Sequence, residues 1–512
     1  MPASFLHGVE VIEVTSGPNP VSVVKSAVIG LVGTAPSWAV AAPSLAPAPN
    51  VPALVSSALN AANFGPLIQG YTIPYALAAI QAQGAGQAIV INVFDPTRHF
   101  TAIASQAMSF PASGAQVLNL GHMGVAGVVV KNAGGTTTYA AGTDYSLDAV
   151  NGVITALSGG TMTIAEAVTV SFNYADPSKV ADADVIGTVT GGVYTGIQAL
   201  QTTYGTMGVF AKLLAAPGYS QNTDVASAMA TMANRVRAMA LVDSPASTPV
   251  ATAIANRGVA GNSFDTSSSR VILCYPQEQF YDAGLVPTGV TLTSAGTPAP
   301  ASFAGISVGP YSQWVAGAIA AKDLSNGYWW SPSNTGIEGI LGPDVNIYAS
   351  ILDPLSDVNS LNAQGIATVF NAFGTGLRLW GNRSAAYPAD TAPDNFINVR
   401  RTMDVIEESI ELSMLQFIDQ PISNALITAI LASVNAFIRS LIQRGALVAG
   451  SASYDPAENP PNQVAAGQLV FDVDVMPPPP AERITFQSFI DSTLLAQLGQ
   501  TSPLTAAAAA TA

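Results

Sequence analysis

The chain has 512 residues, of which 17 are Lys or Arg and 32 are Asp or Glu, so only 10% are charged and the formal net charge is -15. Soluble proteins usually carry about 25% charged residues, and large apolar surfaces usually mark contacts with other proteins. The composition therefore favours a chain with protein partners on several sides. It disfavours nucleic acid as a partner, because phosphate binding requires clustered Lys and Arg.

The single cysteine, Cys274, excludes an internal disulfide, and the apolar run 271–275 around it predicts a buried strand. A chain without disulfides fits a reducing compartment. Residues 1–24 contain two glutamates and no Lys or Arg, the opposite of a secretory leader. The apolar segment 422–442 contains several polar side chains and Arg439, so we interpret it as an amphipathic helix packed against protein and not as a membrane span.

The first 24 residues predict an extended arm. They contain a β-prone, nearly alternating segment with the apolar side chains Val9, Val11, Ile12 and Val14. Glycine and proline at 17–20 prevent a helix directly after it. Because no hairpin partner lies nearby in the sequence, this strand is expected to pair with a distant one.

Residues 25–97 predict the N-terminal part of an α/β core, in which two buried strands flank a helix at 75–83. Residues 98–176 are different: they are rich in Gly, Thr and Val, and glycine pairs separate short β-prone runs. This pattern predicts an inserted all-β outer domain. Within it, the turn signal Asn151-Gly152 predicts a hairpin.

Residues 177–395 predict the main α/β core, because helices, expected at 196–204 and 224–240, alternate with short apolar strands. Residues 396–512 predict a helical and β domain with an extended arm and a disordered tail after Ser502. Its two helices are expected at 402–418 and 423–444. Two later strands are expected at 469–475 and 484–489. The candidate arm residues in them are Leu469, Phe471 and Val473 in the first strand and Ile484 and Phe486 in the second.

The residue types that carry catalysis and metal binding are scarce. His7 lies in the arm, and His99 and His122 lie in or beside the β insert, away from the α/β core where a Ser/His/Asp site is expected. One cysteine and three histidines exclude a Cys/His metal cluster, and Asp353 and Asp394, each beside a proline, are typical of turns. No phosphate-binding Gly-x-x-x-x-Gly-Lys-Ser/Thr loop occurs. The sequence predicts no catalytic residue, no metal and no cofactor.

Two segments in the second half carry a specific resemblance. The first reads Leu379-Trp380-Gly381-Asn382-Arg383, and the second places Arg400 and Arg401 together at the start of a helix. With landmarks at 215–218 and 331–342, this set resembles the contractile tail sheath family of phages and related injection particles. The similarity extends from residue 28 to residue 484, excluding the insert.

The resemblance implies a multidomain α/β protein with a layered, subtilisin-like α/β core, an all-β inserted domain on the outer face of the tail, and extended N- and C-terminal arms. It implies a structural subunit that polymerises as stacked six-fold rings around an inner tail tube and contracts to drive the tube through a cell envelope. The implied partners are further copies of the chain, the tube protein, the baseplate and the tail terminator, without nucleic-acid contact or membrane insertion. The implied location is the virion tail, assembled in the host cytoplasm, and the arms are expected to add strands to sheets of neighbouring subunits.

The paired arginines have a separate physical consequence. Cations at a helix start oppose the helix dipole, so Arg400 and Arg401 are expected to have carboxylate partners, either inside the subunit or across an interface. Two other functions fit the composition: a secreted surface-layer or other lattice protein, and an Ala/Gly/Thr-rich enzyme. The missing secretion signal disfavours the first, and the scarcity of histidine disfavours the second.

Overall fold

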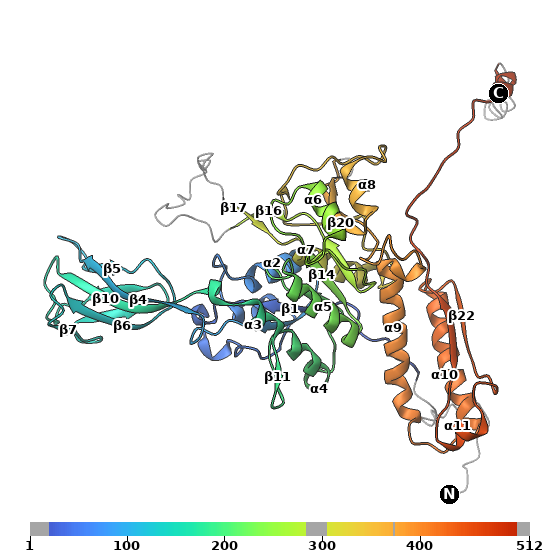
Figure 1. The fold of residues 1–512 in the computed structure, drawn as a ribbon, viewed down its shortest axis with the longest axis horizontal. Coiled ribbons are helices and arrows are strands. Elements are labelled where there is room, and N and C mark those ends of the chain that lie inside the picture. The colour runs from blue at the N-terminus through green and yellow to red at the C-terminus, as the bar shows by residue number, and fades with distance from the viewer. Residues whose placement is uncertain (1–19, 283–304, 372–373, 499–512) are drawn as a thin grey trace, which may run out of the picture. The chain divides into compact units, whose positions relative to one another are not determined.

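The computed structural model of the protein describes residues 20–282, 305–371 and 374–498 (Figure 1). The predicted strand at Val9, Val11, Ile12 and Val14 and the tail after Ser502 lie outside these residues. The chain divides into two compact units, residues 1–480 and 481–512. Each unit is described by itself below.

A nine-stranded sheet with the order β18-β21-β20-β15-β14-β13-β1-β3-β2 forms the centre of the first unit. Its middle strands run parallel. They are β20 (Ile366–Asn371), β15 (Val271–Cys274), β14 (Met239–Asp243), β13 (Leu213–Ala215), β1 (Val28–Gly33) and β3 (Gln87–Asn92). The edge strands run antiparallel to their neighbours: β2 (Ala53–Val55), β21 (Leu377–Trp380) and β18 (Thr335–Gly336).

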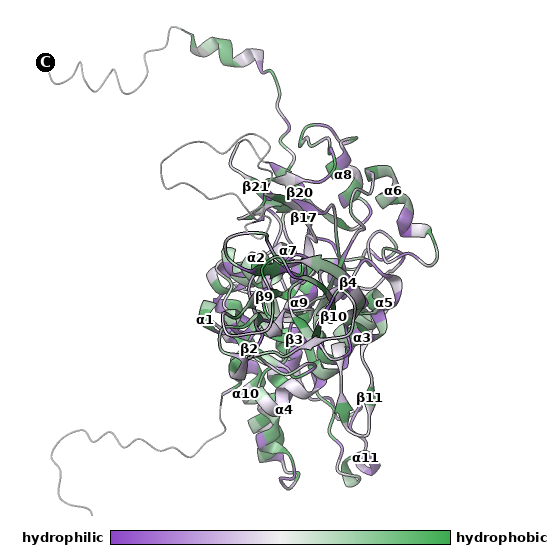
Figure 2. Cartoon of the chain, turned by 90° about the vertical axis from the view of Figure 1, so that its left-hand side faces the viewer, coloured by the Kyte–Doolittle hydropathy of each residue, from purple (hydrophilic) through white to green (hydrophobic). Residues whose placement is uncertain are grey.

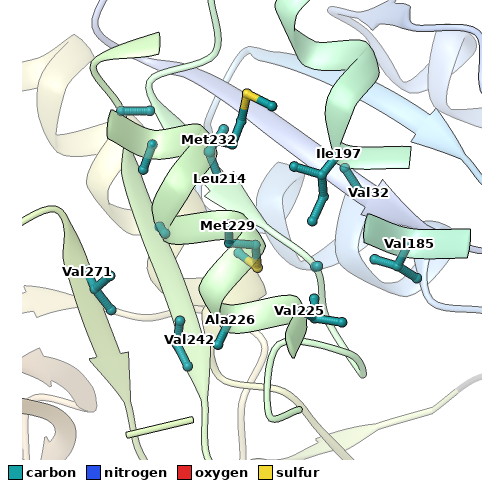
Figure 3. Packing of buried hydrophobic residues seen from close by; sticks show 14 of the residues in the cluster. Val32, Val185, Ile197, Leu214, Val225, Ala226, Met229, Met232, Val242 and Val271 are labelled. Carbon is teal, nitrogen blue, oxygen red and sulfur yellow. The ribbon is translucent and has the colours of Figure 1, made fainter. Parts of the chain in front are cut away.

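Helices cover both faces of this sheet, which explains why its strands are continuously apolar. Along β1, Val28 and Val32 face one core cluster, whereas Ile29 and Leu31 face the other. The first cluster lies under α5 (Thr223–Val236), as Figure 3 shows. The second lies under α2 (Ile73–Ala82) and α7 (Ser312–Asn326).

Two helices of this core differ from the prediction. The helix expected at 224–240 is α5, which ends at Val236 because Arg237 takes a left-handed conformation (φ 49°) and β14 starts at Met239. The helix expected at 196–204 is a 3-10 helix over 196–202 followed by α4 (Thr203–Met207).

Residues 100–175 form two antiparallel sheets around a buried cluster of their own. One sheet contains β4 (Phe100–Ser109), β10 (Ala167–Ala175), β6 (Val125–Asn132) and β7 (Thr138–Tyr139). The other contains β5 (Val117–Asn119), β9 (Val153–Ala156) and β8 (Tyr145–Asp148).

The hairpin predicted around Asn151-Gly152 is confirmed as the pair β8 and β9. Gly152 has a φ of +66°, and a Cβ atom there would lie 1.9 Å from the carbonyl oxygen of His122. Glycine is therefore required both by the turn and by the close approach of His122.

The C-terminal part of the first unit contains α9 (Ile397–Met414), α10 (Asn424–Gln443), α11 (Pro461–Ala465) and the antiparallel pair β22 (Ala449–Ser453) and β23 (Asp472–Met476). Helix α9 begins at residue 397, not at 402 as predicted. Phe396 supplies no side-chain cap, and a tertiary bond from the N–H of Ile397 to the carbonyl of Asn382 (3.0 Å) fixes the entry instead. Because this bond comes from outside the helix, no capping pattern in the neighbouring sequence marks the start. Helix α10 starts with a side-chain cap, in which Ser423 Oγ accepts from the N–H of Leu426 (3.2 Å).

The second unit contains little regular structure. The strand predicted at 484–489 does not form in the single chain, where Ile484 is 70% and Phe486 90% exposed. A short 3-10 helix (Ser492–Gln497) follows, capped by Asp491, and its leucines are also exposed. Figure 2 shows the hydrophobic colouring of this short helix near the C-terminus.

Candidate functional site

Several structural features gather around α9 and α10. The described chain starts at Pro20 and runs along this helix pair. The N–H of Ser22 donates to Ser413 Oγ (3.2 Å), and that of Val24 donates to Ser409 Oγ (3.1 Å). Beside this segment the small side chains of α10 line a groove of about 900 Å³, whose other wall is Pro20 and Val21. The first described residues, 20–24, thus contact both α9 and α10.

The pair β22 and β23 lies against the same helices. The side chain of Asn435 on α10 bonds both backbone groups of Ala452 in β22 at 2.9 Å, which fixes this strand to the helix. Strand β23 has no further strand partner among the described residues. An open strand edge can accept another strand.

The predicted arm residues near β23 divide between two roles. Val473 lies in β23 and pairs with Ala452 of its own chain. Leu469 and Phe471 precede the strand, and the Phe471 ring packs on Tyr454 with 5.5 Å between centroids. This segment is therefore used inside its own subunit, whereas Ile484 and Phe486 have exposed side chains in the second unit.

The predicted motif at 379–383 lies at the edge of the central sheet and holds the start of α9. Leu379 is buried in β21, and the Trp380 ring packs on Phe370 with 4.8 Å between centroids. The carbonyl of Asn382 accepts the N–H of Ile397. The Arg383 guanidinium stacks on the ring of Phe396, 3.8 Å from its centroid.

Gly381 in this motif is required by its surroundings. Its φ is +136°, and a Cβ atom would lie 2.7 Å from Asn362 Oδ1 and 2.8 Å from Ala367 Cα. A side chain there would force the edge strand away from the sheet.

The paired arginines have carboxylate partners, as expected, and the structure places them within the subunit. Arg401 forms a bidentate pair with Asp323 at the end of α7, in which Nη1 lies 2.7 Å from Oδ1. Both side chains are almost fully buried. Arg400 pairs with Asp404 one turn along (2.9 Å) and with Glu407 (3.3 Å). Arg401 therefore attaches α9 to the core, whereas the partners of Arg400 lie on α9 itself.

Further carboxylates on α9 form ion pairs that the sequence analysis missed. Asp404 contacts Arg270, Glu408 contacts the buried Lys212, and Glu411 contacts Arg237 at 2.7 Å. The spacing of these acids shows that they share one helix face. Their partners come from distant loops and strands, so sequence spacing carries no signal for them.

Burial and ion pairing shift the pKa values of two side chains in this cluster. Burial lowers the pKa of Lys212, although Glu408 opposes that effect, and Nζ also donates to the carbonyl of Val236 (3.1 Å). The hydrogen bond from Arg237 lowers the pKa of the Glu411 carboxyl. The cluster joins α9 to the core through opposite charges.

The described histidines and aspartates show no catalytic or metal constellation. His99 Nε2 lies 3.5 Å from Asp184 at the base of the insert, and the His122 ring stacks on Tyr174 with 3.8 Å between centroids. Among the described residues, no group of three His, Cys, Asp or Glu side chains is placed to hold a metal ion. Asp353 accepts the N–H of Leu355 (2.8 Å), as a turn residue does.

By length and composition, α10 is the one helix of the described chain that passes a test for membrane spans. Its predicted apolar stripe is used inside the protein. Leu426, Val434, Phe437 and Leu441 are buried, and Ile430 packs at the margin of the same cluster. Only 28% of its apolar window is buried, so the rest of the helix is open in the single chain.

Comparison with known families matches three parts of the sequence. The description "Phage tail sheath protein central domain" matches residues 192–385, and "Phage tail sheath C-terminal domain" matches residues 390–491. A third family, "Protein of unknown function UCP028589", matches residues 97–184, which include strands β4 to β10.

Two tail sheath relatives match the chain, one of them over nearly its whole length. The tail sheath protein of Burkholderia phage BcepMu is 46% identical over 501 residues, which are 97% of this chain and 99% of the relative. The tail sheath protein of Escherichia phage P2 is 26% identical over 62% of this chain and 72% of its own length.

Two solved structures are similar in fold. The helical sheath of the anti-feeding prophage in its contracted state gives a TM-score of 0.57 at 17% identity, covering 96% of this chain and 100% of that one. The contracted sheath complex of the contractile injection system PVC gives 0.56 at 15% identity, covering 96% and 99%.

Proposed function

Because the chain belongs to the phage tail sheath family and is thus a structural subunit of a contractile virion tail, we propose that it polymerises as stacked six-fold rings around an inner tail tube. Contraction of this polymer drives the tube through the target cell envelope. The observation that carries the proposal is the 46% identity to a tail sheath protein over 97% of the chain. The energy comes from the difference in interface free energy between two arrangements of the subunits.

We also propose a domain organisation, which the sheets and buried clusters support. Residues 25–97 and 177–395 form one subtilisin-like α/β core, and residues 98–176 form an outer domain inserted into it. The central parallel sheet with helices on both faces supports the first statement. The separate buried cluster and the separate family match at 97–184 support the second.

Both arms bind to neighbouring copies of the chain by strand addition. The N-terminal strand around Val11 and the C-terminal segment with Ile484 and Phe486 add to β22 and β23 of other subunits. The open edge of β23 and the exposure of Phe486 support this arrangement. Each added backbone hydrogen bond contributes about 0.5 to 1.5 kcal/mol net, so two arms link the copies while the cores move.

The remaining partners are the tube protein, the baseplate and the tail terminator. Helices α9 and α10 face the tube, and the ion pairs of α9 keep them attached to the core during contraction. Neither nucleic-acid contact nor membrane insertion is part of the proposal. The low number of basic residues and the inward packing of the α10 stripe support these two points.

The arm is tested with a strand-breaking substitution. Val11→Pro removes a backbone donor and is disfavoured inside a strand, whereas the matched Val11→Ile keeps the strand. We expect striated hollow cylinders by negative-stain microscopy for the wild type and for Val11→Ile, and unassembled subunits for Val11→Pro. Long cylinders from Val11→Pro, or from a variant without residues 1–20, contradict the arm proposal, and flat arrays from the wild type would favour a surface-layer protein.

A further inference from the structure

A second group of exposed apolar side chains lies in the loop before α8 (Asp357–Asn362). Leu352 is 89% and Leu355 83% exposed, and Tyr348 and Ile351 are about half-exposed. We name residues 348–356 the knuckle. Four large apolar side chains in so short a segment are unusual for a surface that meets only water.

Hydrogen bonds fix the knuckle from within. Ser350 Oγ accepts from the N–H groups of Leu352 and Asp353 (both 3.2 Å), and its carbonyl accepts from Ser356 Oγ (3.0 Å). Asp353 accepts from the N–H of Leu355 (2.8 Å) and from the hydroxyl of Tyr348 (3.0 Å). The polar groups of the loop thus bond each other, and the two leucines extend outward in a defined arrangement.

The knuckle is also attached to the core. Ser356 is fully buried and caps α8, and Val358 and Leu361 of that helix are buried. The N–H of Tyr348 donates to the carboxylate of Asp357 (2.8 Å), which connects the start of the loop to the same helix. A movement of the core therefore carries the leucines with it.

We propose that the knuckle is a contact surface for a second copy of this chain, with Leu352 and Leu355 packed against an apolar surface of the neighbouring subunit. The proposal rests on the proposed function, in which copies of the chain surround each subunit. Subunits of a helical polymer meet through heterologous contacts, so one patch on each copy covers a different patch on the next. Asp353 and Asp357 are both hydrogen-bonded inside the loop, so the surface presented to the partner is apolar.

A second copy is the occupant that these observations favour. An apolar projection left uncovered on every subunit of a finished tail would promote aggregation of particles. Another copy is present at every position where the projection occurs. Burial of two leucine side chains removes apolar surface from water at every subunit, which makes this pair a substantial contact when it is repeated along a polymer.

The first test compares two double variants. Leu352→Asp with Leu355→Asp places charges at the contact, whereas Leu352→Met with Leu355→Met keeps an apolar surface of similar volume. Both are expected to unfold like the wild type as unassembled subunits, because these side chains contact water there. We expect at least about a tenfold higher concentration for cylinder formation from the aspartate variant and wild-type assembly from the methionine variant. Wild-type assembly from the aspartate variant overturns the proposal.

The second test identifies the partner. A photo-crosslinking benzoylphenylalanine replaces Leu352, and cylinders are assembled from equal amounts of ¹⁴N- and ¹⁵N-labelled subunits. Crosslinked peptides that contain both isotopes support the proposal. Crosslinks confined to one copy, or formed with the tube protein in assembled tails, overturn it. The proposed function fails separately, if the unmodified chain forms no cylinders.

Discussion

Arg401 and Asp323 show how much a single side chain contributes where water is excluded. The carboxylate and the guanidinium are almost fully buried and face each other with two hydrogen bonds. Removing one partner leaves the other charge buried without compensation, which is more costly than removing both. The pair therefore fixes the position of α9 on α7 more than it adds to the net free energy of unfolding.

Arg401→Ala is expected to lower the free energy of unfolding by about 3 to 5 kcal/mol. The double variant Arg401→Met with Asp323→Leu is expected to lose less, because no unpaired charge remains. Urea unfolding of unassembled subunits measures both values. Equal losses from the single and the double variant would contradict this account.

Asp243 makes the stability depend on pH. It lies buried at the end of β14, and burial raises its pKa from 3.8 to about 6, although Ser312 and Ser220 donate hydrogen bonds to it. Since the folded chain holds this proton more tightly than the unfolded chain, the group contributes stability below about pH 4 that is lost as the pH rises through about 6.

Asp243→Asn removes this titration. The free energy of unfolding of the variant, relative to the wild type, is expected to increase between pH 4 and pH 7 by about 2 kcal/mol. Urea unfolding at pH 4, 5, 6 and 7 measures the difference. A difference that stays constant with pH would refute the assignment.

Gly381 offers a matched pair with Gly376. Both have positive φ, but a Cβ atom meets Asn362 and Ala367 at the first position and nothing within 4 Å at the second. Gly376→Ala is expected to cost about 1 to 2 kcal/mol from backbone strain. Gly381→Ala is expected to cost more, about 3 kcal/mol or above, because the clash adds to the strain. Thermal unfolding compares the two, and equal costs would show that the clash is relieved.

At the scale of elements, residues 100–175, proposed above as an insert, and the central sheet with its helices have separate buried clusters. The strands of the insert enclose their own cluster. Arg98 and His99 at its base contact Asp184 in the core. In addition, the Trp38 ring lies so close to Gly124 that a Cβ atom on this glycine would be within 3 Å of the ring. Each part thus has the apolar contacts needed to fold.

Replacing residues 100–175 by a short Gly/Ser linker is therefore expected to leave the core folded. Its thermal midpoint is expected to change by less than about 5 °C. Calorimetry of the shortened chain measures this, with the full chain as the control. Loss of a cooperative transition would show that the insert stabilises the core.

Sequence patterns predicted elements whose signals are local. The amphipathic helix α10 and the Asn151-Gly152 turn were interpreted correctly, because the residues of each pattern lie within a few positions of each other. The predicted start of α9 was wrong, because the real start depends on a hydrogen bond from Ile397 to Asn382, which lies outside the helix. The partners of Glu408 and Arg401 come from segments about 80 to 200 residues away in sequence, which no local pattern reports.

At the scale of the whole molecule, like charge opposes assembly. Each copy carries a formal charge of -15, so neighbouring subunits repel each other at low ionic strength. Polymerisation is expected to increase as NaCl rises from about 10 to about 150 mM, where the screening length falls from about 30 to about 8 Å. Light scattering with microscopy of the same samples measures it. Dissolution of cylinders over this range would indicate that attractive ion pairs dominate the contacts.

The two ends of the insert meet at one point of the core. The N–H of Asp176 donates to the carbonyl of His99 at 3.0 Å, so the chain leaves and re-enters the core side by side. A foreign domain whose own termini are adjacent fits the same opening without stretching either strand. Phage tails built from this chain would then display an enzyme or an antigen once per subunit along their length, as a regular scaffold with fixed spacing.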